Sequence, residues 1–264
     1  MAPPPAPIDA DLQVHGYAVA RGAAAEQVTS LLDVVEASAL GASGQVAFSD
    51  HALDVDARRT VHRRVREIVG PVAAILAPHH RIVSASLVVK GPRTAAELDW
   101  HLDPSITDER RWRSISLWIP LVEVGPTNGS LEVLDAGHLE APLDRGGRDR
   151  LVATYPPHAA ALGRCRVRAG APSGPLVLAA GDVVAYDHRM PHRSGANPTD
   201  RSRPAVNVGL LPVGAPLLVH IWDDRRVVAH EVPDDFFAVA DLGAAPDGWF
   251  HREPTVGPPR DAPS

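Results

Sequence analysis

The sequence holds a single cysteine, Cys165, and no apolar run near the roughly 20 residues that are needed to span a bilayer. One cysteine excludes an intrachain disulfide, and this scarcity fits a reducing compartment. The N-terminal stretch MAPPPAPIDADLQ has neither the basic nor the apolar region of a signal peptide, so we expect none. We therefore expect a cytoplasmic protein without a membrane partner.

Positive charge is also scarce, because 26 Lys plus Arg residues stand against 32 Asp plus Glu, for a net charge of −6. This balance argues against the broad basic surface of a nucleic-acid-binding protein. Lys90 is the only lysine, a bias that coding by a GC-rich genome explains. Aromatic residues make up only 5%, but a hydrophobic content of 45% is enough for a substantial core. A chain of 264 residues can form one large β domain or two smaller domains.

The N-terminal third favours helices. Residues 1–8 are rich in proline, and we expect them to be disordered. Residues 23–38 have the apolar spacing of an amphipathic helix. A second helix is predicted over residues 56–77, with a break near Gly70 and Pro71, because proline interrupts the hydrogen bonds of a helix.

From Arg81 onward the sequence favours short strands bounded by Gly, Pro or Asn. No alternation of strands and helices occurs, so a parallel doubly wound sheet is not expected. The predicted fold class is mainly β with flanking helices, an antiparallel jelly roll or barrel with the N-terminal α-helices packed outside. The predicted strands lie within residues 15–22, 81–90, 114–124, 129–135, 174–187 and 204–213.

One segment interrupts the strand pattern. Residues 137–174 are too many for a hairpin turn, and long insertions of this kind are usually functional, so we interpret the segment as a lid. We expect one domain over residues 9–250, with a disordered tail over residues 251–264.

The residues that predict chemistry are two histidines and one aspartate. His101 and Asp103 are two apart, which on a strand places both side chains on one face. The pair is too short a motif to mean much alone. The stretch GDVVAYDHRMPH, however, supplies a turn, an apolar strand and then His192. Two histidines and a carboxylate form the facial triad of non-haem iron(II) oxygenases, so we predict a metal site.

Arginines follow His192. Arg203 begins the next predicted strand, and antiparallel pairing with the His192 segment would bring both side chains inside. Its planar guanidinium suits the distal carboxylate of a keto acid better than lysine does. Arg201 lies in a polar turn, where we expect it to be solvated. His188 is expected to be a satisfied or exposed polar residue that points away from the metal and pairs with its charged neighbours.

Taken together and in order, these stretches resemble the phytanoyl-CoA dioxygenase family of Fe(II)- and 2-oxoglutarate-dependent oxygenases. The resemblance covers most of residues 12–212 and rests on HGYAVARG, VVKGP, WHLD, SLWIPL, NGSLEVLDAGH and GDVVAYDHRMPHRSGANPTDRSRP. The stretch DAGH replaces the Pro-Gly-Ser-His of many members, which affects only a turn. The resemblance implies a double-stranded β-helix, in agreement with the predicted strands.

The resemblance also implies roles for individual residues. His101, Asp103 and His192 would be the iron ligands. Arg203 would bind the far carboxylate of 2-oxoglutarate with help from Ser194, and Trp118 would line the co-substrate pocket. The expected cofactors are Fe(II), 2-oxoglutarate and O2. The expected reaction is the oxidation of a small molecule, above all its hydroxylation, with release of succinate and CO2.

Two alternatives stay open from the sequence. One is a cupin-like metal oxygenase without 2-oxoglutarate, and the other is a non-catalytic β-barrel that binds a small molecule. The GC-rich composition favours a bacterial biosynthetic role. The sequence specifies neither the substrate nor the oligomeric state.

Overall fold

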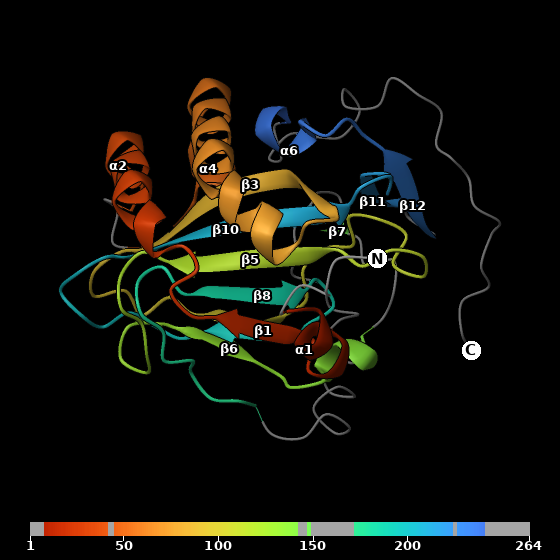
Figure 1. The fold of residues 1–264 in the computed structure, drawn as a ribbon. Coiled ribbons are helices and arrows are strands. Elements are labelled where there is room, and N and C mark those ends of the chain that lie inside the picture. Colours follow the sequence, from red (N-terminus) through yellow and green to blue (C-terminus); the bar gives the residue numbers. More distant parts are fainter. Residues whose placement is uncertain (1–7, 42–44, 142–146, 149–171, 224–225, 241–264) are drawn as a thin grey trace.

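The computed structural model describes residues 8–41, 45–141, 147–148, 172–223 and 226–240 (Figure 1). Three sequence predictions therefore fall wholly or mainly outside the described residues: the two disordered ends and the interior of the 137–174 insertion. Ile8, the last residue of the predicted N-terminal tail, is described and is buried in the core.

A six-stranded antiparallel sheet forms the centre of the fold (Figure 1). Its middle strands, β5 and β10, carry side chains that alternate between two environments. Leu117, Val206 and Val208 face the helices, whereas Trp118, Arg203 and Asn207 face the interior of the jelly roll. The strand order is β1 (Tyr17–Ala20), β8 (Val183–Asp187), β5 (Ile115–Pro120), β10 (Arg203–Pro212), β3 (His80–Lys90) and β2 (Val46–Phe48).

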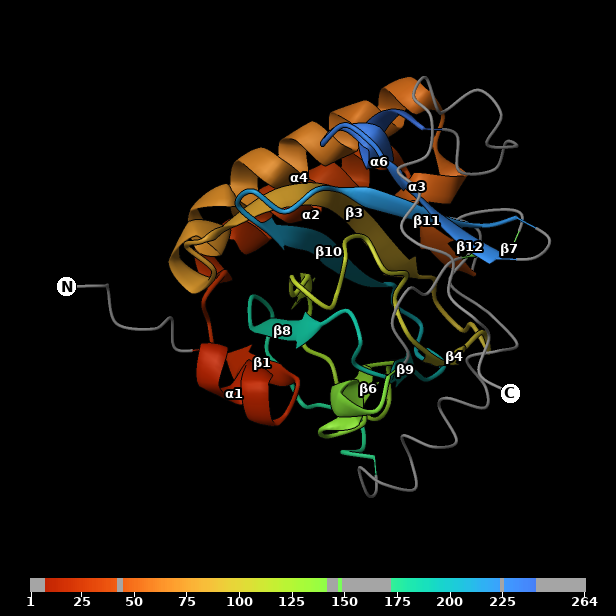
Figure 2. The same cartoon turned by 90° about the vertical axis from the view of Figure 1, so that its right-hand side faces the viewer.

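Two smaller sheets complete the β structure, and the first of them is called the small sheet below. The first lies across from the inner face of the large sheet (Figure 2) and has the order β4 (Leu98–His101), β9 (His192–Ser194) and β6 (Leu131–Val133). The second has the order β12 (Arg226–Glu231), β11 (Leu218–Asp223) and β7 (Gly147–Arg148). The predicted fold class, a mainly β jelly roll with helices outside, is confirmed. The β11–β12 hairpin was not predicted.

Helices cover the outer face of the large sheet (Figures 1 and 2). The two longest are α2 (Val28–Ser38) and α4 (Val55–Leu76), whose buried side chains join the core beneath them. None of the helices within the described ranges is long and apolar enough to cross a membrane. The shorter ones are α1 (Asp9–Val14), η1 (Ala25–Gln27), α3 (Ser49–Ala52), η2 (Gly137–Leu139) and α6 (Phe236–Val239).

The predicted break in the second helix was wrong. Helix α4 runs for 22 residues with Pro71 inside it. A proline removes one backbone donor and crowds the preceding turn. Val65, Val69 and Val72 are nevertheless all buried against the sheet, and this continuous apolar face holds the helix together on both sides of the proline. Asp54 caps its first turn by accepting hydrogen bonds from two backbone N–H groups.

Candidate active site

Three of the predicted site residues meet between the two facing sheets. His101 ends β4 and pairs across the small sheet with His192, which begins β9. Asp103 follows two residues after β4, and its Oδ1 lies 3.7 Å from Nε2 of His192. One potential ligand atom from each residue lies within 4.8 Å of the other two. Within the described part of the chain, no other group of three His, Cys, Asp or Glu residues converges in this way.

Backbone carbonyls fix the protons of the two histidines. Nδ1 of His101 lies 2.7 Å from the Asp99 carbonyl, and Nδ1 of His192 lies 2.9 Å from the Met190 carbonyl. Because a carbonyl only accepts, each Nδ1 carries the proton and each Nε2 keeps its lone pair. Burial, together with the neighbouring His192, lowers the pKa of His101 to about 4, so its ring is neutral at pH 7. Two imidazoles whose Nε2 atoms are not used by these hydrogen bonds and a carboxylate match the donor set of an iron(II) site.

Arg203 is a buried cation beside this triad. It is 1% exposed, and its Nε and Nη1 have no hydrogen-bond partner among the described residues. The guanidinium lies 5.5 Å from the centre of the Trp118 ring. Burial lowers the pKa of Arg203 to about 10, which still leaves it charged at neutral pH. A buried charge with open donors is costly unless an anion pairs with it, so the site is built for an anionic ligand.

The strand pairing that places Arg203 in the site differs from the predicted pairing. Strand β10 lies between β3 and β5, and Arg203 is opposite Lys90 rather than beside the His192 segment. The expected direct pairing was wrong because β9 belongs to the small sheet. The two sheets face each other, so the side chains still converge. One small cavity of about 80 Å³ is lined by all six predicted residues, His101, Asp103, Trp118, His192, Ser194 and Arg203.

Two polar residues of the site, Tyr186 and Asn207, were not predicted. Tyr186 and Asn207 line the same cavity, and the Tyr186 ring lies 4.9 Å from the His192 ring. Burial and the charge of Asp103 raise the pKa of Tyr186 well above its usual value. Oδ1 of Asn207 and Oγ of Ser194 are buried without a partner in the described chain. Strand parity was the available signal, because Asn207 lies four residues after Arg203 on the same face.

His188 was expected to be a satisfied or exposed polar residue, and only the charged neighbours expected as its partners were wrong. Asp187 is instead occupied by Arg189 and Arg113. His188 turns inward, is buried, and hydrogen-bonds with Ser116. It does not belong to the converging triad.

Lys90 is fully buried, and its ammonium group is used for structure. Nζ donates to the carbonyls of Ser194 at 3.0 Å and Ala96 at 3.3 Å, and also to that of Gly195. An ammonium has three protons, and three carbonyls take them. Burial and the nearby Arg203 lower the pKa of Lys90 to about 8. Lys90 therefore ties β9 to the large sheet rather than offering a donor to a ligand.

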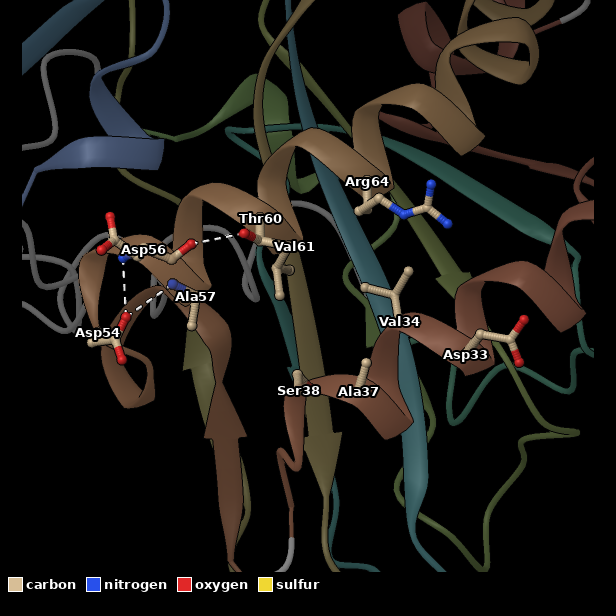
Figure 3. Close-up of a pocket in the computed structure, with 10 residues that line it drawn as sticks. All are labelled: Asp33, Val34, Ala37, Ser38, Asp54, Asp56, Ala57, Thr60, Val61 and Arg64. Carbon is tan, nitrogen blue, oxygen red and sulfur yellow. Dashed lines mark hydrogen bonds between the residues drawn. The ribbon is translucent and has the colours of Figure 1, made fainter.

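A second cavity is larger than the one at the triad and is the other candidate for the active site. A cavity of about 650 Å³ lies between α2 and α4 on the outer side of the sheet (Figure 3). Two of its polar residues serve helix α4, because Asp54 caps the helix and Thr60 donates to the carbonyl of Asp56. It lacks the converging ligand atoms of the triad, so we place the chemistry in the smaller cavity.

Comparisons with solved structures show the same fold. AviO1 from Streptomyces viridochromogenes Tue57 has a TM-score of 0.55 and 21% identity, over 81% of this chain and 97% of that one. The epimerase SnoN, solved with Fe3+, alpha ketoglutarate and nogalamycin RO, has a TM-score of 0.54 and 19% identity, over 79% and 83%. EctD from S. alaskensis, solved with 2-oxoglutarate and 5-hydroxyectoine, has a TM-score of 0.51 and 22% identity, over 79% and 76%.

No curated protein matches the sequence. A family comparison, in contrast, matches residues 12–205 to Phytanoyl-CoA dioxygenase (PhyH), and this range contains all six predicted site residues. The chain therefore belongs to the phytanoyl-CoA dioxygenase family, and it is an Fe(II)- and 2-oxoglutarate-dependent oxygenase.

Proposed function

We propose that this enzyme hydroxylates a small-molecule substrate at an iron held by His101, Asp103 and His192. The observation that carries the proposal is the arrangement of donors. Two imidazole nitrogens with free lone pairs and one carboxylate converge beside a buried guanidinium whose donors are open. This combination suits a divalent metal and an anionic co-substrate side by side.

The three side chains fit iron(II) and leave room around it. These three residues would hold the metal, and two histidines with one carboxylate are the donor set of non-haem iron(II) sites that would also take the co-substrate and dioxygen. Bound iron supplies the redox chemistry that couples dioxygen to the conversion of 2-oxoglutarate into succinate and CO2. The hydrogen bonds from His101 and His192 to backbone carbonyls hold both rings in the orientation that ligation needs.

Arg203 is proposed to hold the far carboxylate of 2-oxoglutarate. Its fork can pair with both carboxylate oxygens, and the buried Ser194 hydroxyl supplies a further donor. Trp118 lies beside the guanidinium and walls the same cavity. This cation counts against an oxygenase that works without an acidic co-substrate, and the triad counts against a barrel that only binds a ligand.

We further propose a role in bacterial secondary metabolism and a cytoplasmic location. SnoN, which shares the fold, is described as an enzyme of nogalamycin biosynthesis, and this supports a natural-product substrate here. The cytoplasm supplies 2-oxoglutarate and keeps iron reduced.

The test is succinate formation by anaerobically purified, Fe(II)-loaded protein with a panel of natural-product scaffolds. We expect succinate to form in step with an oxygenated product, detected by mass spectrometry. His101→Ala should abolish both products. Metal-loaded protein that binds 2-oxoglutarate yet yields no succinate with any substrate would contradict the proposal.

A further inference from the structure

We propose that Ser116 and His188 form a buried hydrogen-bonded pair that positions Asp103 for one-oxygen ligation of the metal. The Ser116 hydroxyl donates to Oδ2 of Asp103 in a long hydrogen bond of 3.5 Å. The same hydroxyl lies 3.0 Å from Nε2 of His188. The three side chains thus form a chain of contacts that ends on the carboxylate of the triad.

The position of the proton on His188 follows from the surroundings of its two ring nitrogens. Nδ1 of His188 is buried and has no hydrogen-bond partner in the described residues. A proton on Nδ1 would be a buried donor without an acceptor, which costs more than an unused lone pair. The proton therefore lies on Nε2 and is donated to the Ser116 oxygen. The hydroxyl proton of Ser116 then has two acceptors in reach, Oδ2 of Asp103 and the Tyr186 oxygen, and we assign it to the carboxylate because that acceptor is charged. The direction of donation is His188 to Ser116 to Asp103.

This arrangement gives the two oxygens of Asp103 different tasks. Oδ1 faces the triad, 3.7 Å from Nε2 of His192. Oδ2 accepts from Ser116. When a donor occupies one carboxylate oxygen, only the other oxygen is left to bind the metal. The hydrogen bond also fixes the rotation of the carboxylate group. The pair therefore keeps the second oxygen from taking a position that the co-substrate or dioxygen needs.

Neighbouring elements hold the pair rigidly. Ser116 lies on β5 and His188 directly follows β8, and these two strands are paired in the large sheet. The backbone N–H of His188 donates to the Ser114 carbonyl at 3.2 Å. Gly209 faces the imidazole from β10, where a Cβ atom would lie 3.9 Å from Cε1 of His188 and 2.4 Å from Oγ of Ser84. The imidazole is thus held from three strands.

Tyr186 is a second hydroxyl beside the same carboxylate. Burial is the largest cause of its raised pKa, followed by the charge of Asp103, and its hydroxyl is hydrogen-bonded to both Ser116 and Asp103. Loss of Ser116 therefore removes one of two hydroxyl donors. We expect the effect on metal affinity to fall at the lower end, about 10-fold, of the 10- to 100-fold typical of such outer partners.

The experiment compares Ser116→Ala with Ser114→Ala. Ser114 is a matched control, because it is just as buried and its hydroxyl has no hydrogen-bond partner in the described chain. The readouts are the Kd for Co(II), from calorimetry on metal-free protein, and the visible spectrum of the bound Co(II). We expect a roughly 10-fold weaker Kd and a shifted spectrum for Ser116→Ala, and wild-type values for Ser114→Ala.

Two changes at His188 separate positioning from packing. His188→Gln keeps an N–H donor near the place of Nε2, whereas His188→Leu keeps the volume but removes the donor. We expect Gln to restore most of the Co(II) affinity and spectrum that Leu loses, with similar thermal midpoints for the two metal-free variants.

The inference rests on the proposed ligand role of Asp103, and the outcomes keep the two apart. If wild-type protein does not bind Co(II), the proposed function and this inference both fail. If wild-type protein binds but Ser116→Ala binds equally well with the same spectrum, only the positioning role fails. Equal losses for the Gln and Leu variants would show that His188 acts through shape alone.

Discussion

Lys90 and Arg203 are two buried cations opposite each other on neighbouring strands. They differ in the hydrogen-bond acceptors that are available to them. Backbone carbonyls accept all three ammonium protons of Lys90, so this cation holds strands together. Two nitrogens of Arg203 have no such partner within the described residues. One cation thus builds the pocket, and the other remains available to bind.

Replacing Arg203 tests whether this residue binds the co-substrate. Arg203→Ala should weaken 2-oxoglutarate binding by about 2–5 kcal/mol, which corresponds to a Kd raised about 30-fold or more. Arg203→Lys should recover only part of the loss, because an ammonium lacks the two-pronged geometry. Calorimetric titration of 2-oxoglutarate into Co(II)-loaded protein measures the effect, and the Kd for Co(II) serves as control. Unchanged co-substrate affinity in Arg203→Ala would exclude the role.

Replacing Lys90 tests whether this residue stabilises the fold. Lys90→Met should lower the free energy of unfolding by about 1–3 kcal/mol, because buried carbonyls lose their donor. Arg201→Met is the control, since it removes the same charge from an exposed turn residue. Urea denaturation monitored by circular dichroism gives both values. Equal stability of the two variants would show that the three carbonyl contacts contribute nothing.

At the scale of elements, β9 illustrates what the sequence could and could not predict. The apolar strand before His192 and the strand beginning at Arg203 were both predicted, because alternation and flanking turns are local signals. The sheet to which each strand belongs was not predicted, since pairing is decided by packing between distant segments. The same reason explains Pro71, where burial of the valines of α4 outweighs a local helix breaker.

The six site residues were predicted from spacing and family resemblance, and the structure brings them into one cavity. Their supporting residues were not found, because Ser116, His188 and Lys90 act through contacts with residues far along the chain. A serine in an apolar strand carries no sequence signal that distinguishes it from an ordinary core residue.

The close approach at Gly129 gives a test at the element scale. Gly129 has a φ of 76°, and a Cβ there would lie 2.6 Å from the Gly195 carbonyl oxygen and 3.0 Å from Cδ of Lys90. Gly129→Ala should therefore push β9 away from the large sheet and destabilise the protein by more than 1 kcal/mol. Gly125→Ala is the matched control, because its nearest contact would be 4.0 Å away. Thermal melts of the two variants measure the difference, and identical midpoints would contradict the clash.

At the scale of the whole molecule, the site joins two sheets that touch it from opposite sides. The small sheet supplies His101 and His192, and the large sheet supplies Trp118 and Arg203. The two sheets face each other in Figure 2. Occupants of the site therefore connect the two layers, and their binding free energy adds to the stability of the folded state.

Metal loading should raise the melting temperature. At a metal concentration of about 100 times Kd, the native state gains about 2.7 kcal/mol, which for a protein of this size is a shift of about 5–10 °C. Mn(II) is a suitable stand-in, because it does not oxidise in air as readily as Fe(II). The shift should disappear with a chelator and in the double variant His101→Ala/His192→Ala. A shift that survives in that variant would place the metal elsewhere.

The position of β10 inside the large sheet also governs how the site opens. Backbone amides of β10 are bonded on both sides, to β3 and to β5, whereas the small sheet consists of three short strands. Local opening costs least where few hydrogen bonds and little buried area are lost. In metal-free protein, amide hydrogen exchange at β4 and β9 should therefore be faster than at β10. The half of the pocket with Arg203 stays formed while the half with the histidines opens and recloses, so iron can enter without unfolding of the enzyme.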